Sequence, residues 1–231
     1  MSGRSRLLPL LIIGLAIAWL TPERLSAQDQ TTAADSRVVQ ISAGMGIDGV
    51  RAKSMTDWMT EEAKPADQLG LFATAIEFFV TPEVQVGENW SIGVDYSYLF
   101  SSRTIDGSTG RWTFAYQAHL PIAQVHYLLR GTGYWLKAGG GIGYWWANLQ
   151  EQYVTLGSER DGTASGPGLK LDVVANTAFD DHLFGSIGVE FRAGVLGTFK
   201  DRNGSAIQSL GSDVNLNFIS AGVKFGLMYQ F

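Results

Sequence analysis

The chain has 231 residues and a formal net charge of −5; only 17% of its residues are charged and 45% are hydrophobic. It contains no cysteine, which excludes disulfides, thiolate catalysis, cysteine-ligated metal and a lipid-modified N-terminal cysteine. Beyond the N-terminus, no apolar run approaches the roughly 18–20 residues that a membrane-spanning helix needs. The apolar residues therefore occur in short stretches, which favours β-strands.

The first 27 residues have the pattern of a secretory signal peptide. Arg4 and Arg6 form the positive start, and residues 7–20 form the apolar stretch. Ser26 and Ala27 supply the small residues expected before the cleavage site.

Leu25 is bulkier than the residue usually found three places before the cut, so the sequence does not fix the cleavage site. Cleavage after Ala27 leaves a short lead, residues 28–36, before the strands begin. The mature chain then has 14 basic and 21 acidic residues and a charge of about −7. An acidic exported protein is a poor candidate for nucleic-acid binding.

From residue 37 onward, apolar residues alternate with small or polar ones in one segment after another, which is typical of strands. The sequence predicts an all-β domain over residues 37–231, an eight-stranded antiparallel up-and-down barrel. In chain order, the expected strands are 39–47, 72–80, 90–100, 111–129, 134–146, 169–179, 187–195 and 214–231.

Two of these strands change the parity of their apolar residues. In the fourth, the apolar series 112–120 reaches Pro121 and then shifts by one place, and the eighth strand shifts near Ser220. A proline combined with a parity switch is the sequence pattern of a β-bulge. We therefore expect 111–129 to be one long, kinked strand.

Long and short connections alternate along the chain, as in a transmembrane barrel with turns on one side and loops on the other. The long polar connections are 49–69, 101–110, 149–167 and 199–212, and the short ones are 81–88, 130–132 and 180–182. An even number of strands places both termini on the side of the short turns. No segment with a helical period, second domain or internal repeat is predicted.

Alternation alone would also fit a soluble barrel with an apolar interior. Here the apolar face is too bulky for a small interior, and the other face is mainly Gly, Ser and Ala with isolated charges. Aromatic residues gather near the strand ends, as in the interfacial girdles of membrane barrels. The expected girdle residues are Trp90, Phe100, Trp112, Tyr134, Trp135, Trp145, Trp146, Phe179, Tyr229 and Phe231.

The last strand alternates through Val223, Phe225, Leu227, Tyr229 and Phe231. This pattern resembles the β-signal that outer-membrane proteins present to the barrel assembly machinery. Together with the strand count and the alternating connections, it makes the mature chain similar to the small outer-membrane barrels of the OmpA/OmpX type. The resemblance implies the lipid of a Gram-negative-type outer membrane as surroundings, but it implies no particular activity.

The glycine-rich segment 139–143 superficially resembles a phosphate-binding loop, but no helix follows it. At strand spacing, Gly139, Gly141 and Gly143 instead face the lumen and leave room for larger side chains. No residue is therefore predicted to bind a cofactor.

The three histidines, His119, His126 and His182, lack the spacing of a metal site. We predict no metal site and no catalytic residue. Some outer-membrane barrels of this size are lipid-modifying hydrolases or transferases, and His126 could meet a serine and an acid from neighbouring strands. The enzyme interpretation therefore stays open as an alternative.

Isolated charges project into the expected lumen in equal numbers of each sign. They are the acids Glu77, Asp95, Asp172 and Glu190 and the bases Lys137, Lys170, Arg192 and Lys224. Unpaired charges would be costly in a narrow interior, so we expect ion pairs. The alternative is a path for a substrate or an ion.

The sequence thus predicts a non-enzymatic outer-membrane barrel with a closed lumen, in which partner recognition resides in loops 49–69 and 149–167. A barrel that transports small solutes or apolar molecules is the first alternative. A lipid-modifying enzyme is the second.

Overall fold

A computed structural model describes residues 38–64, 74–155, 157–209 and 212–231. The expected signal peptide, the short lead and the first two residues of the second expected strand lie outside the described residues.

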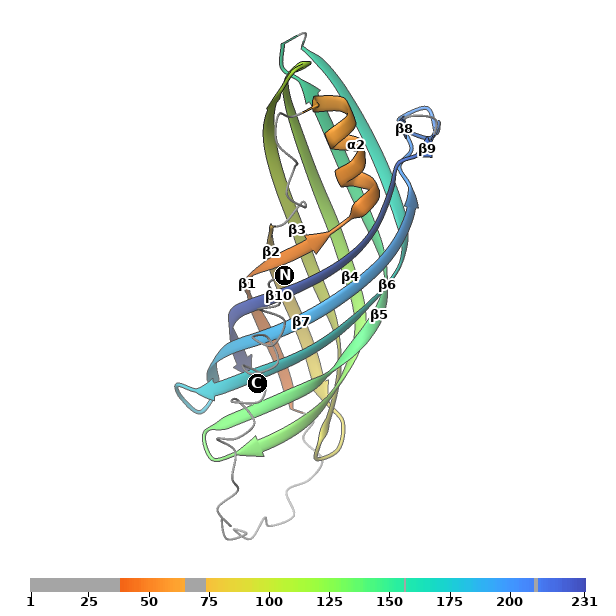
Figure 1. The fold of residues 1–231 in the computed structure, drawn as a ribbon. Coiled ribbons are helices and arrows are strands. Elements are labelled where there is room, and N and C mark those ends of the chain that lie inside the picture. Colours follow the sequence, from red (N-terminus) through yellow and green to blue (C-terminus); the bar gives the residue numbers. More distant parts are fainter. Residues whose placement is uncertain (1–37, 65–73, 156, 210–211) are drawn as a thin grey trace, which may run out of the picture. The chain divides into compact units, whose positions relative to one another are not determined.

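Eight long antiparallel strands of the described chain close into a barrel in the order β1-β10-β7-β6-β5-β4-β3-β2 (Figure 1). They are β1 (Val39–Arg51), β2 (Ala75–Gln85), β3 (Trp90–Gly107), β4 (Gly110–Gly131), β5 (Tyr134–Tyr153), β6 (Ser158–Ala178), β7 (Leu183–Thr198) and β10 (Asn215–Gln230). A small hairpin, β8 (Gln208–Ser209) and β9 (Ser212–Asp213), lies between β7 and β10 in sequence. The predicted architecture, an eight-stranded antiparallel barrel, is confirmed.

The barrel wall is apolar on the outside and charged on the inside. Ile47, Ile142 and Val195 are 59–73% exposed on the outer face, whereas Lys170 and Arg192 are fully buried inside. This is the reverse of a soluble protein and matches a wall that faces lipid. The predicted orientation of the two faces is therefore confirmed.

Most expected girdle residues, among them Trp90, Tyr134, Trp146 and Phe179, are exposed on the outer face. Three others point inward: Trp145 is completely buried, Trp135 contacts the buried ring of Phe184, and Trp112 packs against the inner apolar core. The girdle assignments of Trp135 and Trp145 were wrong because each lies next to an outward aromatic residue, and neighbouring residues of a strand face opposite sides of the sheet. That of Trp112 was wrong because the apolar residues of this part of β4 face the inner core.

The β-bulge predicted at Pro121 does not occur. Strand β4 keeps one register with β3 on both sides of Pro121, and Ser220 likewise lies in an unbroken ladder with β7 and β1. The parity switch has another cause. On one part of each strand the apolar residues face lipid, and on the other part they face an apolar core inside the barrel.

Two of the predicted loops are strands instead. Strands β3 and β4 are joined directly after Gly107, and β5 and β6 extend to Tyr153 and from Ser158, so 101–110 and 149–167 are mostly paired. The alternation is hard to recognise there because the outward residues are polar, as Ser102 and Thr104 show. These strands extend beyond the apolar belt, where their outer face meets water.

The predicted loop 49–69 contains a helix, α2 (Lys53–Ala63), which was not predicted from the sequence. Its buried residues, Met55, Trp58, Met59 and Ala63, form one apolar stripe. No helix of the described residues is long and apolar enough to cross a membrane.

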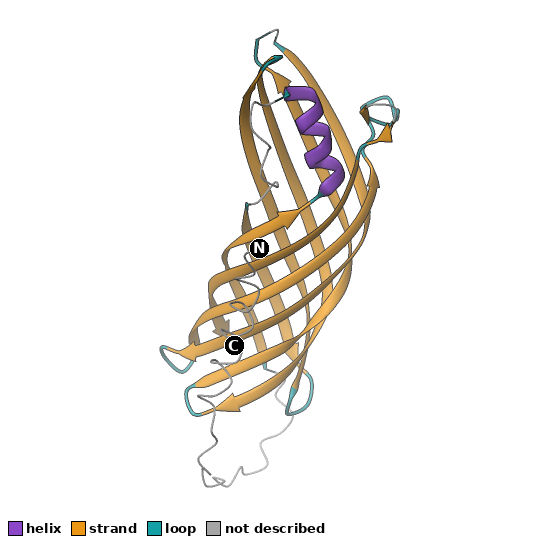
Figure 2. Ribbon diagram, viewed as in Figure 1, coloured by secondary structure: helices purple, strands orange, loops and turns teal. Residues whose placement is uncertain are grey.

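Helix α2 packs against β4 and β10 and covers the apolar core of the barrel (Figure 2). The indole of Trp58 meets the ring of Phe114 edge to face at 5.1 Å. The helix ends where Lys64 adopts a left-handed conformation and donates its N–H to the carbonyl of Thr60. We call the barrel end that holds the helix the α2 side and the opposite end the turn side.

Replacing Trp58 with alanine should release the helix, because the contact with Phe114 and the filled volume are lost. Truncating a buried tryptophan costs about 3–5 kcal/mol. Trp58→Ala should therefore make residues 53–63 cleavable by protease while the barrel keeps its folded mobility on gels. Thr60→Ala, at an exposed position of the same helix, is the control; equal protection of the helix in both variants would contradict this packing.

Candidate functional site

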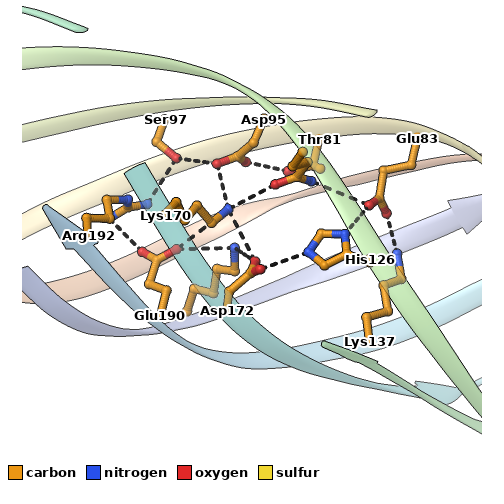
Figure 3. Close-up of polar contacts among 12 residues, drawn as sticks. Thr81, Glu83, Asp95, Ser97, His126, Lys137, Lys170, Asp172, Glu190 and Arg192 are labelled. Atoms are coloured by element: carbon orange, nitrogen blue, oxygen red, sulfur yellow. Dashed lines mark hydrogen bonds and ion pairs between the residues drawn. The ribbon is translucent and has the colours of Figure 1, made fainter. Parts of the chain in front are cut away.

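Most charged residues inside the barrel form one buried network, shown in Figure 3. Glu151, buried on the α2 side, lies outside this network and pairs with Arg160. All eight residues predicted from the alternation are buried, and each makes at least one ion pair. The predicted pairing is therefore confirmed.

Lys170 lies at the centre of the network. Its Nζ is 2.8 Å from Oδ2 of Asp95, 3.3 Å from Oδ2 of Asp172 and 3.8 Å from Oε2 of Glu190. The Thr81 hydroxyl donates to the other oxygen of Asp95 at 2.6 Å. These contacts come from β6, β3, β7 and β2, so this one amine links strands around the barrel.

Arg192 forms the part of the network nearest the α2 side. Its guanidinium is 3.1 Å from Oδ1 of Asp48 and 2.6 Å from Oε1 of Glu190, and it also pairs with Glu77. The Ser97 hydroxyl donates to Oε1 of Glu77 at 2.6 Å. Three carboxylates therefore share one guanidinium, whose planar donors suit several acceptors at once.

The turn-side part of the network is built around His126. Its Nδ1 is 2.6 Å from Oε1 of Glu83 and its Nε2 is 2.8 Å from Oδ1 of Asp172. A carboxylate oxygen only accepts hydrogen bonds, so these contacts assign a proton to both ring nitrogens and a positive charge to His126. Lys137 pairs with Glu83 at 2.5 Å, and Lys224 lies 3.3 Å from both Asp172 and Glu190.

Asp48, Glu83 and His126 were not among the lumen charges predicted from the sequence. Glu83 fell in the predicted turn 81–88, but strand β2 continues to Gln85 and carries Glu83 into the lumen. The alternation along the strands does carry a signal for two of these residues. Glu83 lies an even number of residues after Glu77, and His126 lies two residues after Gln124, so each faces the lumen with its neighbour.

The contacts of His126 do not fit a nucleophile–base pair. A general base needs a free nitrogen toward a hydroxyl, and both nitrogens of His126 already face carboxylates. The nearby Ser91 hydroxyl contacts Glu83 at 3.4 Å. His119 and His182 lie outside this network. The ring of His119 contacts the Tyr96 hydroxyl and stacks on Trp146 at the barrel wall. His182 lies in a turn, where it contacts the Gln230 carbonyl.

The carboxylates of Asp48, Glu77 and Glu190 approach one another within 4.8 Å, as ligands of a metal ion would. The guanidinium of Arg192 contacts all three. Because this cation already lies between the carboxylates, we interpret the cluster as part of the ionic network.

The glycines of β5 make room for these side chains, as predicted. A Cβ at Gly139 would lie 2.0 Å from the Val125 carbonyl oxygen and 2.6 Å from Cδ2 of His126. Similar clashes exclude a side chain at Gly141. Close packing leaves a void of about 20 Å³ next to His126 and Lys224, enough for about one water molecule.

An apolar core fills the barrel on the α2 side of the network. The ring of Trp145 stacks on that of Phe218 at 5.6 Å, and Leu120 and Phe114 are fully buried nearby. In the described residues, the barrel interior thus contains paired charges toward the turn side and, apart from Glu151, mainly apolar side chains toward the α2 side.

Removing one partner of the network should destabilise the barrel in proportion to the charges left unpaired. Arg192→Met leaves Asp48 and Glu77 without an ion-pair partner and takes one of three cations from Glu190, and it should cost about 3–5 kcal/mol. Lys137→Met should cost less, because Glu83 keeps His126 and Gln40 as partners. Thermal unfolding in detergent measures both, and an equal or smaller loss for Arg192→Met would contradict the network.

No protein-family profile matches the chain, and no curated protein matches it by sequence. Solved structures do match. Neisserial surface protein A is 12% identical, with 87% of this chain and 100% of that chain covered and a TM-score of 0.48.

Ail of Yersinia pestis, in complex with the heparin analogue sucrose octasulfate, is 12% identical, with coverages of 85% and 100% and a TM-score of 0.49. The outer membrane protein OprG of Pseudomonas aeruginosa is 13% identical, with coverages of 84% and 96% and a TM-score of 0.49. At these identities and TM-scores, the matches do not indicate what this chain binds or does.

Proposed function

We propose that the chain is a non-enzymatic barrel of a Gram-negative-type outer membrane, exported by a cleaved signal peptide, with a closed lumen and a surface-exposed α2 side. The filled interior carries the proposal: an apolar wall surrounds paired charges and an apolar core. Eight strands enclose a space that side chains can just fill, unlike the aqueous channel of 16-stranded porins.

The α2 side offers the surface for a partner. The strands β3 to β6 extend beyond the apolar belt there, and the helix, rather than a long loop, occupies residues 53–63. A cleft of about 520 Å³ separates the exposed face of the helix from the segment around β9 and is lined by Asp57, Glu61 and Asp213. Rigid elements that carry polar groups at a cleft are suited to recognition.

Recognition of the last strand by the barrel assembly machinery stays a prediction. Tyr229 and Phe231 are exposed on the wall, and the Phe231 N–H donates to the Val39 carbonyl at the seam between the first and last strands.

A closed lumen predicts that the purified protein conducts little in planar bilayers. The paired charges hold one another, and the apolar core lies in the same path, so ions would have to displace both. Current recordings of the wild-type chain should show no steady ohmic conductance. Steady conductance that Glu190→Gln or Arg192→Met abolishes would instead make these residues a pore lining and support the transport alternative.

The proposed orientation predicts which positions can be labelled from outside intact cells. The chain has no cysteine, so single cysteines report without background. Ser158→Cys, at the exposed start of β6 on the α2 side, should react with an impermeant thiol reagent, and Thr132→Cys, in a turn, should not. Labelling of the second variant alone would invert the orientation.

A further inference from the structure

The lipid-facing wall of the barrel is hollowed by a groove of about 960 Å³ over β5, β6, β7 and β10, the strands nearest the viewer in Figure 1. Its apolar lining includes Ile142, Leu169, Ala193, Val195 and Ile219. This volume is at the upper end of the range of small-molecule sites.

The groove exists because the wall is thin at this place. Gly168 and Gly194 face inward against the indole of Trp145, and a Cβ on either would lie 2.3 and 2.7 Å from its ring atoms. On the outer face, Ala193 lies between its cross-strand partners Leu169 and Ile219, and its side chain is smaller than either. At these two glycines the wall consists of backbone alone between the indole of Trp145 and the outside, and the small Ala193 beside them leaves the hollow open.

The groove runs from a cationic end into the apolar belt. Ile142, Leu169, Ala193, Ile219 and Arg51 are cross-strand neighbours in one outward-facing row. Arg51 is the last residue of β1, next to the helix, whereas Ile142 lies within the belt. The row therefore begins at the α2-side edge of the membrane and descends into the hydrocarbon region.

Two cationic side chains lie at the end of the groove nearest the α2 side. Arg51 is exposed and has no ion-pair partner among the described residues, and Lys53 begins helix α2. The Lys53 amine contacts Asp57 at 2.5 Å, but both groups are well exposed, so an anion can still approach it. Cations of this kind, at the edge of an apolar surface, suit a lipid phosphate.

The apolar lining alone cannot select a lipid. Neighbouring acyl chains are as apolar as leucine, so a chain gains little by moving from the bilayer into the groove. Selectivity must come from the headgroup, and here the headgroup position carries positive charge.

We propose that this groove binds a phosphate-bearing glycolipid of the outer leaflet. Its phosphate contacts Arg51 and Lys53, and one acyl chain lies along Ile219, Ala193 and Leu169. The inference rests on the proposed outer-membrane location and orientation, but it does not depend on a closed lumen.

The test uses the full mature chain in nanodiscs of phosphatidylethanolamine that contain a small fraction of either diphosphoryl lipid A or phosphatidylglycerol. Native mass spectrometry counts the lipids that remain bound after release. Lipid A should be retained in preference to phosphatidylglycerol. The double variant Arg51→Gln, Lys53→Gln should lower the apparent affinity for lipid A by about thirtyfold, since each of the two cations near a lipid headgroup contributes on the order of 1 kcal/mol.

Ala193→Leu should also lower retention by filling the groove from outside. Two matched controls should leave retention unchanged: Lys200→Gln removes an exposed charge on the same side, and Ala43→Leu enlarges an outward alanine of β1 elsewhere on the wall. Folding of every variant is checked by its mobility on gels with and without heating.

Unchanged lipid A binding in both groove variants would overturn the proposal, as would an equal loss in the Lys200→Gln control. Equal retention of phosphatidylglycerol would also overturn it, because the site would then not distinguish the outer-leaflet lipid. A dimer that Ala193→Leu dissociates, without bound lipid, would make the groove a protein interface. A conducting wild-type barrel that still retains lipid A would contradict the closed lumen and leave this site standing.

Discussion

The burial of charge inside a narrow barrel is the constraint on which the rest of the structure depends. An isolated ion in this space would cost several kcal/mol, so each charged side chain must find a partner from another strand. Lys170, Arg192 and His126 each contact at least two carboxylates, and those carboxylates come from β1, β2, β3, β6 and β7. The network therefore links strands that share no backbone hydrogen bonds.

The constraint also explains the small residues. A lumen that holds lysine and arginine side chains has no room for further bulk, and glycines on β5 bring the backbone against His126 and Trp145. The polarity of the inner and outer side chains also changes along the barrel axis. Toward the turn side the interior is ionic and the exterior is apolar, whereas on the α2 side the interior is apolar and the exterior polar. Lipid outside the first region and water outside the second account for the difference.

The same packing affects the outer surface. Because Trp145 lies inside the wall against Gly168 and Gly194, the wall is thin there and the lipid-facing side has a hollow. The helix that caps the inner core also carries Lys53 to the edge of that hollow. The packing of side chains inside the barrel thus affects the shape of the outer surface and what that surface can bind.

The sequence by itself determined the strand count, the closed antiparallel architecture, the outward apolar face and the eight lumen charges. Each depends on the alternation of apolar and polar residues along a strand, which is a local pattern that can be read from one sequence. Tertiary structure decided what alternation could not. The parity switches at Pro121 and Ser220 resemble bulges in sequence, and only the surroundings of each strand show that they mark a change from lipid to an inner core.

Helix α2 has a short apolar stripe that becomes stable by packing on Phe114 and its neighbours. The partners of Asp48, Glu83 and His126 are separated by as many as 144 residues in sequence, as Asp48 and Arg192 show. Which carboxylate meets which cation is set by strand register and side-chain reach across the lumen. Only the closed barrel brings those groups together.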